Sequence, residues 1–328
     1  MFSKLKSLLS AAAPGTADVG GAHKKEGDDH LKHDRLGEAI ACYRRAIAID
    51  PDNVDAGVAL GFALSERQQY REAEQRLRHA LSIDPRIADA HYILGTIAKS
   101  EGDDALSIEE YTRAIELKSD FEYAYRDLVA ALIETRQFQK AKETLTSAIS
   151  AFPDSAEFCF YLGNLRSQEG DNDGAVSWYR NALALYPGSA ETHRNLAHVL
   201  GERGEIDESI AAYRAALSFD PTMVDAHIAL GARLQGKGKP EEAAECYERA
   251  VSLQPEATAA HVQLGIILQG RGRVDKAIAC FRRAIALEPG SATTHQYLGN
   301  ALLERGATQE AIACYEEVAT LLLPASFD

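Results

Sequence analysis

The chain has 328 residues, of which 46% are hydrophobic and 26% are charged, and its formal net charge at pH 7 is −14. No apolar run approaches the roughly 20 residues that a membrane-spanning helix needs, so we expect no membrane contact. The acidic balance, without a stripe of Lys and Arg, argues against nucleic acid and favours a protein or peptide partner of basic or mixed charge.

Residues 1–22 are rich in Ala, Gly and Ser without periodicity, and we expect them to form a flexible tail. From residue 23 to residue 325 the chain repeats itself every 34 residues, and residues 326–328 form a second short tail. Each repeat reads as a helix, a turn that often contains Gly, a second helix and a closing residue. The closing positions are Pro51, Pro85, Ser119, Pro153, Pro187, Pro221, Pro255, Pro289 and Leu323.

Two patterns of small and large residues recur inside the repeats. In most first helices a Leu is followed directly by a Gly, as at Leu60 and Gly61. Each second helix has a small residue, a large one four positions later and another small one three positions further on, as at Ala39, Tyr43 and Ala46. These spacings place the three side chains on one helix face, where small residues allow a close approach. The pattern predicts tightly paired antiparallel helices.

These residues resemble the tetratricopeptide repeat family over about nine repeats, from residue 20 to residue 325. The resemblance implies an all-α fold: an α-solenoid of 34-residue helix-turn-helix repeats in a right-handed superhelix. In that fold the first helices line a concave groove. The first repeat departs from the pattern, because Glu26 stands where the Leu is expected. A polar outer helix is what a terminal repeat requires.

Histidines and cysteines recur at fixed positions of the repeat, but not at metal-site spacing. His91, His193, His227, His261 and His295 lie one or more repeats apart, so we expect them to pack rather than to share an ion. His30 and His33 could share a helix face, yet their acidic surroundings favour a solvated cap. We therefore expect neither a metal nor a cofactor.

Four cysteines, Cys42, Cys246, Cys280 and Cys314, share one repeat position, and Cys159 lies elsewhere. Neighbours one repeat apart exceed the roughly 7 Å between Cα atoms that a disulfide tolerates. Reduced structural thiols and a cytoplasmic location are the consequence. Since no residues suggest a nucleophile and base pair, we expect the chain not to be an enzyme.

The polar-side positions of the first helices are the candidate binding surface of the expected groove. They mix apolar, aromatic and sparse basic side chains: Val58, Phe62, Tyr92, Arg126, Phe160, Asn164, Arg194 and His198. A large concave surface without catalytic groups is typical of a module that binds proteins. The sequence predicts a non-catalytic scaffold that binds an extended peptide or a partner helix in this groove.

An alternative is the substrate-recognition arm of a glycosyltransferase, acting in trans or within a longer chain. The array is similar to the repeat arm of O-linked N-acetylglucosamine transferases, which carry a ladder of Asn in the groove. One Asn stands at the comparable position here, which reads Ala59, Ile93, Asp127, Tyr161, Asn195, Ala229, Gln263 and Tyr297.

The last helix of the array ends in an apolar run, Leu321, Leu322 and Leu323. No polar helix follows it to cover the final repeat, and exposed apolar surface of this kind invites association. We expect this end to support a homodimer or to receive another partner.

Overall fold

The computed structural model describes residues 19–322, which form 18 helices and no strands. The all-α repeat architecture expected from the sequence is confirmed. The first helix of the described range begins at Val19, four residues before the repeat boundary expected at residue 23. The flexible tails expected at both ends fall largely on residues 1–18 and 323–328, which lie outside the described range. No helix within that range combines the length and the apolar character that crossing a lipid bilayer requires.

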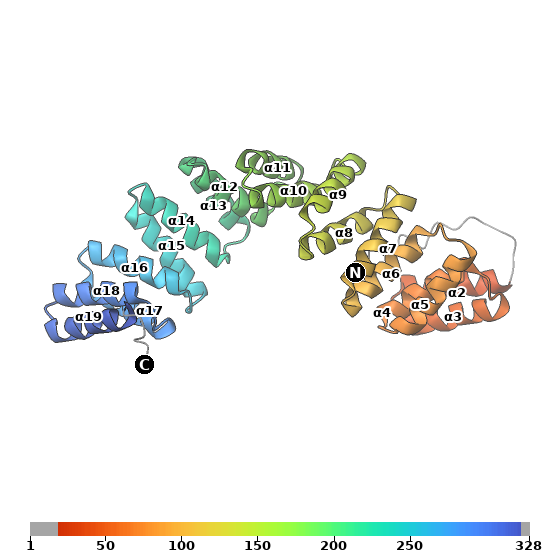
Figure 1. Ribbon diagram of the computed structural model, residues 1–328, viewed down its shortest axis with the longest axis horizontal. Helices are drawn as coiled ribbons and strands as arrows, with labels where there is room; N and C mark the ends of the chain where they lie inside the picture. The colour runs from red at the N-terminus through yellow and green to blue at the C-terminus, as the bar shows by residue number, and fades with distance from the viewer. Residues whose placement is uncertain (1–18, 323–328) are drawn as a thin grey trace. The chain divides into compact units, whose positions relative to one another are not determined.

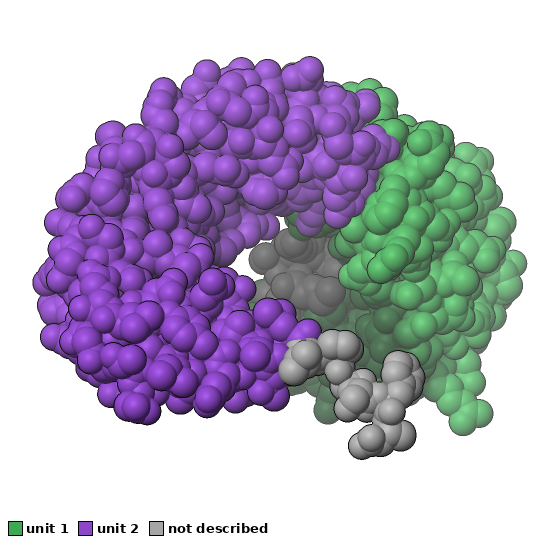
Figure 2. All heavy atoms as spheres, turned by 60° about the vertical axis from the view of Figure 1, so that its left-hand side comes forward, with its two compact units in different colours: residues 1–158 green, residues 159–328 purple. Residues whose placement is uncertain are grey.

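The helices fall into two compact units, residues 1–158 and 159–328, which are coloured separately in Figure 2. Unit 1 contains α2 (Val19–Lys32), α3 (Leu36–Ile49), α4 (Val54–Glu66), α5 (Tyr70–Ile83), α6 (Ala88–Glu101), α7 (Asp104–Leu117), α8 (Glu122–Glu134) and α9 (Phe138–Ala151). The boundary lies inside α10 (Ala156–Gln168). Unit 2 continues with α11 (Asn172–Leu185), α12 (Ala190–Glu202), α13 (Ile206–Phe219), α14 (Val224–Gly236), α15 (Pro240–Leu253), α16 (Thr258–Gly270), α17 (Val274–Leu287), α18 (Ala292–Glu304) and α19 (Thr308–Leu322).

Successive helices pack as pairs, and the ends of the helices follow from local chemistry (Figure 1). Ser189 and Ser291 cap the starts of α12 and α18, where each side chain accepts a hydrogen bond from the backbone N–H three residues later. Where first helices end, the chain turns through a residue with positive φ every 34 residues. These residues are Asp34, Gln68, Gly102, Arg136, Gly170, Gly204, Gly238, Gly272 and Gly306. The glycines expected at these ends are confirmed.

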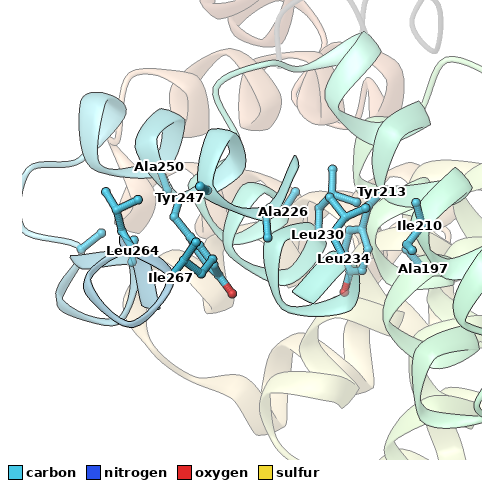
Figure 3. Close-up of a cluster of buried hydrophobic side chains, with 14 of the residues drawn as sticks. Ala197, Ile210, Tyr213, Ala226, Leu230, Leu234, Tyr247, Ala250, Leu264 and Ile267 are labelled. Carbon is cyan, nitrogen blue, oxygen red and sulfur yellow. The ribbon is translucent and has the colours of Figure 1, made fainter. Parts of the chain in front are cut away.

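The core lies between the two helices of each pair and between neighbouring pairs. In unit 2, Tyr213, Tyr247 and Phe281 are at most 2% exposed and pack among small residues and leucines (Figure 3). A Cβ added at Gly265 would stand 2.6 Å from the Phe281 ring. The ring therefore occupies the space that the glycine leaves, which confirms the close approach expected from the pattern of small and large residues.

Candidate functional site

A polar cleft of about 510 Å³ lies on unit 2. It is formed by α10, α12 and α14, the first helices of three successive repeats, together with α11 and α13. Its lining consists of Asn164, Ser167, Gln168, Tyr179, Arg194, Asn195, His198, Tyr213, Asp225 and Ala229. Because first helices present equivalent positions every 34 residues, side chains from neighbouring repeats converge here.

Asn164 is the centre of a hydrogen-bond network in this cleft. Its Oδ1 accepts a hydrogen bond from the Tyr179 hydroxyl at 2.8 Å and another from Asn195 Nδ2 at 2.9 Å. Burial raises the pKa of Tyr179 to about 12, so its hydroxyl remains a donor at neutral pH. An amide side chain has two donor hydrogens and two acceptor lone pairs. The Nδ2 of Asn164 and the Oδ1 of Asn195 thus keep bonding capacity that no described residue uses.

Two guanidinium groups, those of Arg194 and Arg233, and the carboxylates of Asp225, Glu191 and Glu202 set the electrostatics of the cleft. Arg194 Nη1 lies 2.5 Å from Asp225 Oδ2, and Arg194 Nη2 lies 3.7 Å from Glu191 Oε1. At the rim, the exposed His198 lies 3.4 Å from Glu202 Oε1. Carboxylates outnumber the fixed positive charges around the cleft. A ligand that offers N–H groups or a positive charge is therefore favoured.

The structure separates the predicted groove residues into two groups. Val58, Phe62 and Tyr92 are 5%, 2% and 5% exposed, so they belong to the core of unit 1 rather than to an open surface. Helix α4 contacts α2, α3, α5 and α6, and residues 56–64 of this helix are all buried. Tyr92 turns its hydroxyl to Asp127 at 2.7 Å. The expectation that these three side chains face a ligand is therefore corrected.

The other predicted groove residues lie at least partly at the surface. Arg126, in unit 1, places Nε 3.2 Å from Glu157 Oε2 and stacks over the Tyr123 ring. Phe160 is half-buried in unit 2, with its ring centroid 6.2 Å from that of Tyr179. Asn164, Arg194 and His198 line the cleft itself. Three of the eight predicted side chains are therefore brought together.

The recurring histidines have a structural role in the turns. His193, His227, His261 and His295 each place Nε2 3.0–3.1 Å from the carbonyl oxygen of the Pro that closes the preceding repeat. In unit 1, His91 does the same with Pro85 at 3.3 Å, and its Nδ1 lies 2.7 Å from Glu110. These hydrogen bonds fasten α6, α12, α14, α16 and α18 to the turns before them, as the packing interpretation of these histidines implies.

The cysteines are unpaired thiols whose surroundings disfavour the thiolate. Burial raises the pKa of Cys246 to about 11 and also raises the pKa of Cys159, Cys280 and Cys314. An activated cysteine nucleophile has the opposite shift.

At the C-terminal end of unit 2, Leu321 and Leu322 are 37% and 71% exposed on α19, whereas Leu323 lies outside the described range. Self-association through these leucines stays a prediction.

The sequence pattern did not predict that Tyr179, Ser167 and Gln168 line the cleft. Tyr179 occupies the large buried position of its repeat, but its hydroxyl reaches the cleft surface. The spacing of Asn164 and Asn195, which face each other from adjacent first helices, carried a usable signal. Asn164 stands two residues after its repeat Leu, and Asn195 stands one residue before its own.

Comparison with known proteins agrees with the repeat fold. Family models described as tetratricopeptide repeat match residues 30–97, 93–234, 228–292 and 262–321. Human protein O-mannosyl-transferase TMTC1 is 25% identical over 49% of this chain, and the match covers 19% of TMTC1. The probable UDP-N-acetylglucosamine–peptide N-acetylglucosaminyltransferase SPINDLY of Hordeum vulgare is 29% identical over 32% of the chain. That match covers 12% of SPINDLY, so the chain corresponds to a fifth or less of either relative.

A solved structure shows the same fold. The PilF protein of Pseudomonas aeruginosa superposes with a TM-score of 0.53 at 22% identity, over 63% of this chain and 94% of PilF. The matched residues of the family models run without a gap from residue 30 to residue 321. Helix pairs with the expected spacing of small and large residues occupy the same range. This chain belongs to the tetratricopeptide repeat family.

Proposed function

We propose that this protein is a non-catalytic interaction scaffold whose unit 2 cleft binds an extended peptide. The observation that carries the proposal is the Asn164 network, which holds two amide side chains in fixed orientation on adjacent first helices. Tyr179 and Asn195 each donate to Asn164 Oδ1, so the amides are oriented before a ligand arrives. An oriented amide can donate to a peptide carbonyl and accept from a peptide N–H. Preorganisation of this kind lowers the entropic cost of binding.

The charges favour a ligand with positive or N–H-rich character. Asp225 and Glu191 flank Arg194, and the chain as a whole has a net charge of −14. A negative surface attracts basic segments and speeds their encounter. The ligand class is therefore a basic or mixed peptide in extended conformation, read mainly through its backbone.

The alternative function, substrate recognition for a glycosyltransferase, is favoured by one observation. The match to SPINDLY spans residues of the repeat array, and Asn195 occupies the position of the Asn ladder described above. On this alternative the same cleft holds the acceptor peptide while another polypeptide transfers the sugar. Measuring transfer to a cleft-binding peptide, with and without a separate catalytic polypeptide, separates the two functions.

The experiment begins with selection of peptides from a random display library against the full chain. The affinity of a selected peptide is then measured by fluorescence anisotropy for the native chain and for Asn164→Ala and Asn195→Ala. Each variant removes a hydrogen-bonding amide and is expected to weaken binding about tenfold, the equivalent of one such bond.

The matched control is Asn300→Ala. Asn300 accepts a hydrogen bond from Tyr315 at 2.8 Å, as Asn164 does from Tyr179, but no second Asn among the described residues donates to it as Asn195 does to Asn164. Binding is expected to survive this change. If the selected peptides bind equally well to both cleft variants, or are lost with Asn300→Ala, the cleft is not the peptide site.

A further inference from the structure

The first helix pair holds a cluster of metal-ligating side chains that the groove does not use. Glu26 and His30 stand four residues apart on α2, and Cys42 faces them from α3. One carboxylate oxygen, one imidazole nitrogen and the thiol sulfur all lie within 4.8 Å of one another. Cys42 is 3% exposed, His30 is half-buried and Glu26 is exposed, so the cluster runs from the core to the surface.

His30 contributes an observation that the fold alone does not explain. Its Nδ1 is a buried atom without a hydrogen-bond partner among the described residues. Buried polar atoms are usually satisfied, so this nitrogen has the capacity to take a ligand. The partner expected from the sequence, His33, turns away, since its Nδ1 lies 2.8 Å from the Asp29 carbonyl oxygen. His30 therefore lies beside Glu26 and Cys42 rather than sharing a site with His33, and the Glu26 carboxylate also lies 3.3 Å from His23 Nδ1.

The other repeats provide an internal comparison. Cys246, Cys280 and Cys314 occupy the same repeat position as Cys42 and pack against the hydrophobic cluster of unit 2. At the positions equivalent to Glu26 and His30, those repeats have buried leucines: Leu230 and Leu234, Leu264 and Leu268, and Leu298 and Leu302. Only in the first repeat does a carboxylate and an imidazole accompany the thiol.

Replacement of two core leucines deprives α2 of apolar contacts. The buried residues of this helix are Gly20, Gly27 and Leu31, so Leu31 is its one large buried apolar side chain, while the Tyr43 ring of α3 packs on Gly27 and the Tyr43 hydroxyl donates to Asp28. Helices with few buried contacts open at low free energy. A metal ion bound between α2 and α3 would replace the missing contacts with coordinate bonds.

We propose that Cys42, His30 and Glu26 bind one Zn²⁺, with water in the fourth position. Sulfur, imidazole nitrogen and carboxylate oxygen form the ligand set that Zn²⁺ prefers, in tetrahedral geometry. Zinc bond lengths place neighbouring ligand atoms roughly 3.3–3.6 Å apart, so the three side chains close in by about 1 Å. Binding displaces the thiol proton to solvent as the Zn–S bond forms. The site goes beyond peptide binding, and its effect is to fasten α2.

The test uses Co²⁺ as a spectroscopic probe on the full, tag-free and reduced chain. One equivalent is expected to produce the thiolate-to-cobalt charge-transfer band and the visible bands of a tetrahedral site, both abolished by excess Zn²⁺. Cys42→Ser is expected to remove the charge-transfer band. Glu26→Gln, at an exposed position where folding is not at risk, and His30→Gln are each expected to weaken binding at least tenfold.

Two matched variants serve as controls. Cys246→Ser changes the equivalent cysteine of a repeat with leucine neighbours, and His33→Gln changes the nearby histidine that faces away. Both are expected to leave the cobalt spectrum and the affinity unchanged. Circular dichroism confirms that each variant is folded. A chain without a charge-transfer band, a band retained in Cys42→Ser, or an affinity unaffected by Glu26→Gln would overturn the proposal.

As an independent readout, Zn²⁺ is expected to slow amide hydrogen exchange in α2 at least tenfold in the native chain and not in Cys42→Ser. Equal exchange with and without Zn²⁺ in the native chain would contradict the fastening of α2, whatever the cobalt spectrum shows.

Discussion

Units 1 and 2 use the same 34-residue repeat but fill its large buried position differently. In unit 1 this position alternates between aromatic and aliphatic side chains: Tyr43, Leu77, Tyr111 and Leu145. In unit 2 it is aromatic in every repeat: Tyr179, Tyr213, Tyr247, Phe281 and Tyr315. The turns follow the same division. All five positive-φ residues described in unit 2 are Gly, whereas Gly102 is the one Gly among the four in unit 1. Unit 2 thus follows one template throughout.

The two units also differ in whether a buried tyrosine borders an open cleft. In unit 1, Tyr92 is buried and its hydroxyl donates a hydrogen bond to Asp127. In unit 2, the Tyr179 hydroxyl donates a hydrogen bond to Asn164, and the cleft beside it is open to a ligand. Tyr179 and Tyr213 belong to the core as well as to the cleft, whereas the side chains of Asn164, Arg194 and His198 lie at least partly at the surface. Those side chains are therefore available for binding, as functional positions on a rigid scaffold usually are.

Raising the pH is expected to have the largest effect and to act on both units, because burial also raises the pKa of Tyr111 in unit 1 to about 12 and strongly raises the pKa of Tyr43 and Tyr92. Burial raises the pKa of Tyr179 and Tyr247 to about 12 and also raises that of Tyr213, compared with about 10 in an unfolded chain. Above pH 10 the unfolded state loses phenolic protons that the folded state keeps. Stability is therefore complete below pH 10 and falls toward pH 12, by about 3 kcal/mol each for Tyr179 and Tyr247.

Urea unfolding at pH 8 and pH 11, followed by fluorescence of Trp178, the one Trp of the chain, reports on unit 2. The triple variant Tyr179→Phe, Tyr213→Phe and Tyr247→Phe is expected to lose less stability over this interval than the native chain. An equal loss in both proteins would show that these hydroxyls do not govern alkaline unfolding.

A β-branched side chain at the close-packed glycine is expected to cost more in unit 2 than in unit 1. A Cβ at Gly265 meets the rigid Phe281 ring at 2.6 Å, whereas a Cβ at Gly61 meets the flexible Leu77 side chain at the same distance. Overpacking costs about 1–3 kcal/mol, and a side chain that can change rotamer lowers the cost. Gly265→Val is therefore expected to lose more stability than Gly61→Val in urea unfolding.

The chain contains a natural precedent for rescue. Helix α8 carries Val129 at the glycine position and α9 carries Leu145 at the large position, and both are fully buried. Adding Phe281→Leu to Gly265→Val is expected to restore part of the lost stability. A double variant no more stable than the single one would mean that the ring is not the source of the clash.

The fold could be read from the sequence because the repeat fixes local and tertiary contacts together. Gly61 with Leu77, and Gly265 with Phe281, show a spacing that one helix pair alone determines. The cleft was harder to predict, because burial of first-helix residues depends on the neighbouring repeats. Tyr92 donates a hydrogen bond to Asp127, which lies 35 residues further along the chain. The periodicity within a single repeat does not predict such a contact.

The metal-ligand cluster shows a different limit. The sequence suggests pairing His30 with His33, because they are three residues apart. Cys42 shares its repeat position with three other cysteines, so nothing in the sequence links it to His30. Antiparallel pairing places α3 beside α2, so that Gly27 meets the Tyr43 ring and Cys42 reaches Glu26 and His30. The geometry of the helix pair, applied to the one repeat that lacks its leucines, would have found the cluster.

Exchanging turn residues between the units is expected to have the smallest effect on stability. It tests whether the non-glycine turns of unit 1 are less stable than the glycine turns of unit 2. Gln68 holds φ of +60° in unit 1, and Gly238 holds φ of +72° in unit 2 with no atom within 4 Å of an added Cβ. A left-handed conformation costs a residue with a side chain about 1 kcal/mol relative to Gly. Gln68→Gly should therefore stabilise the chain slightly, and Gly238→Gln should destabilise it by about 1 kcal/mol in urea unfolding. Since neither position packs against the core, the two changes are expected to be of opposite sign and to add in the double variant. If both changes destabilise, Gln68 contributes through its side chain, and the turns of unit 1 are not the weaker ones.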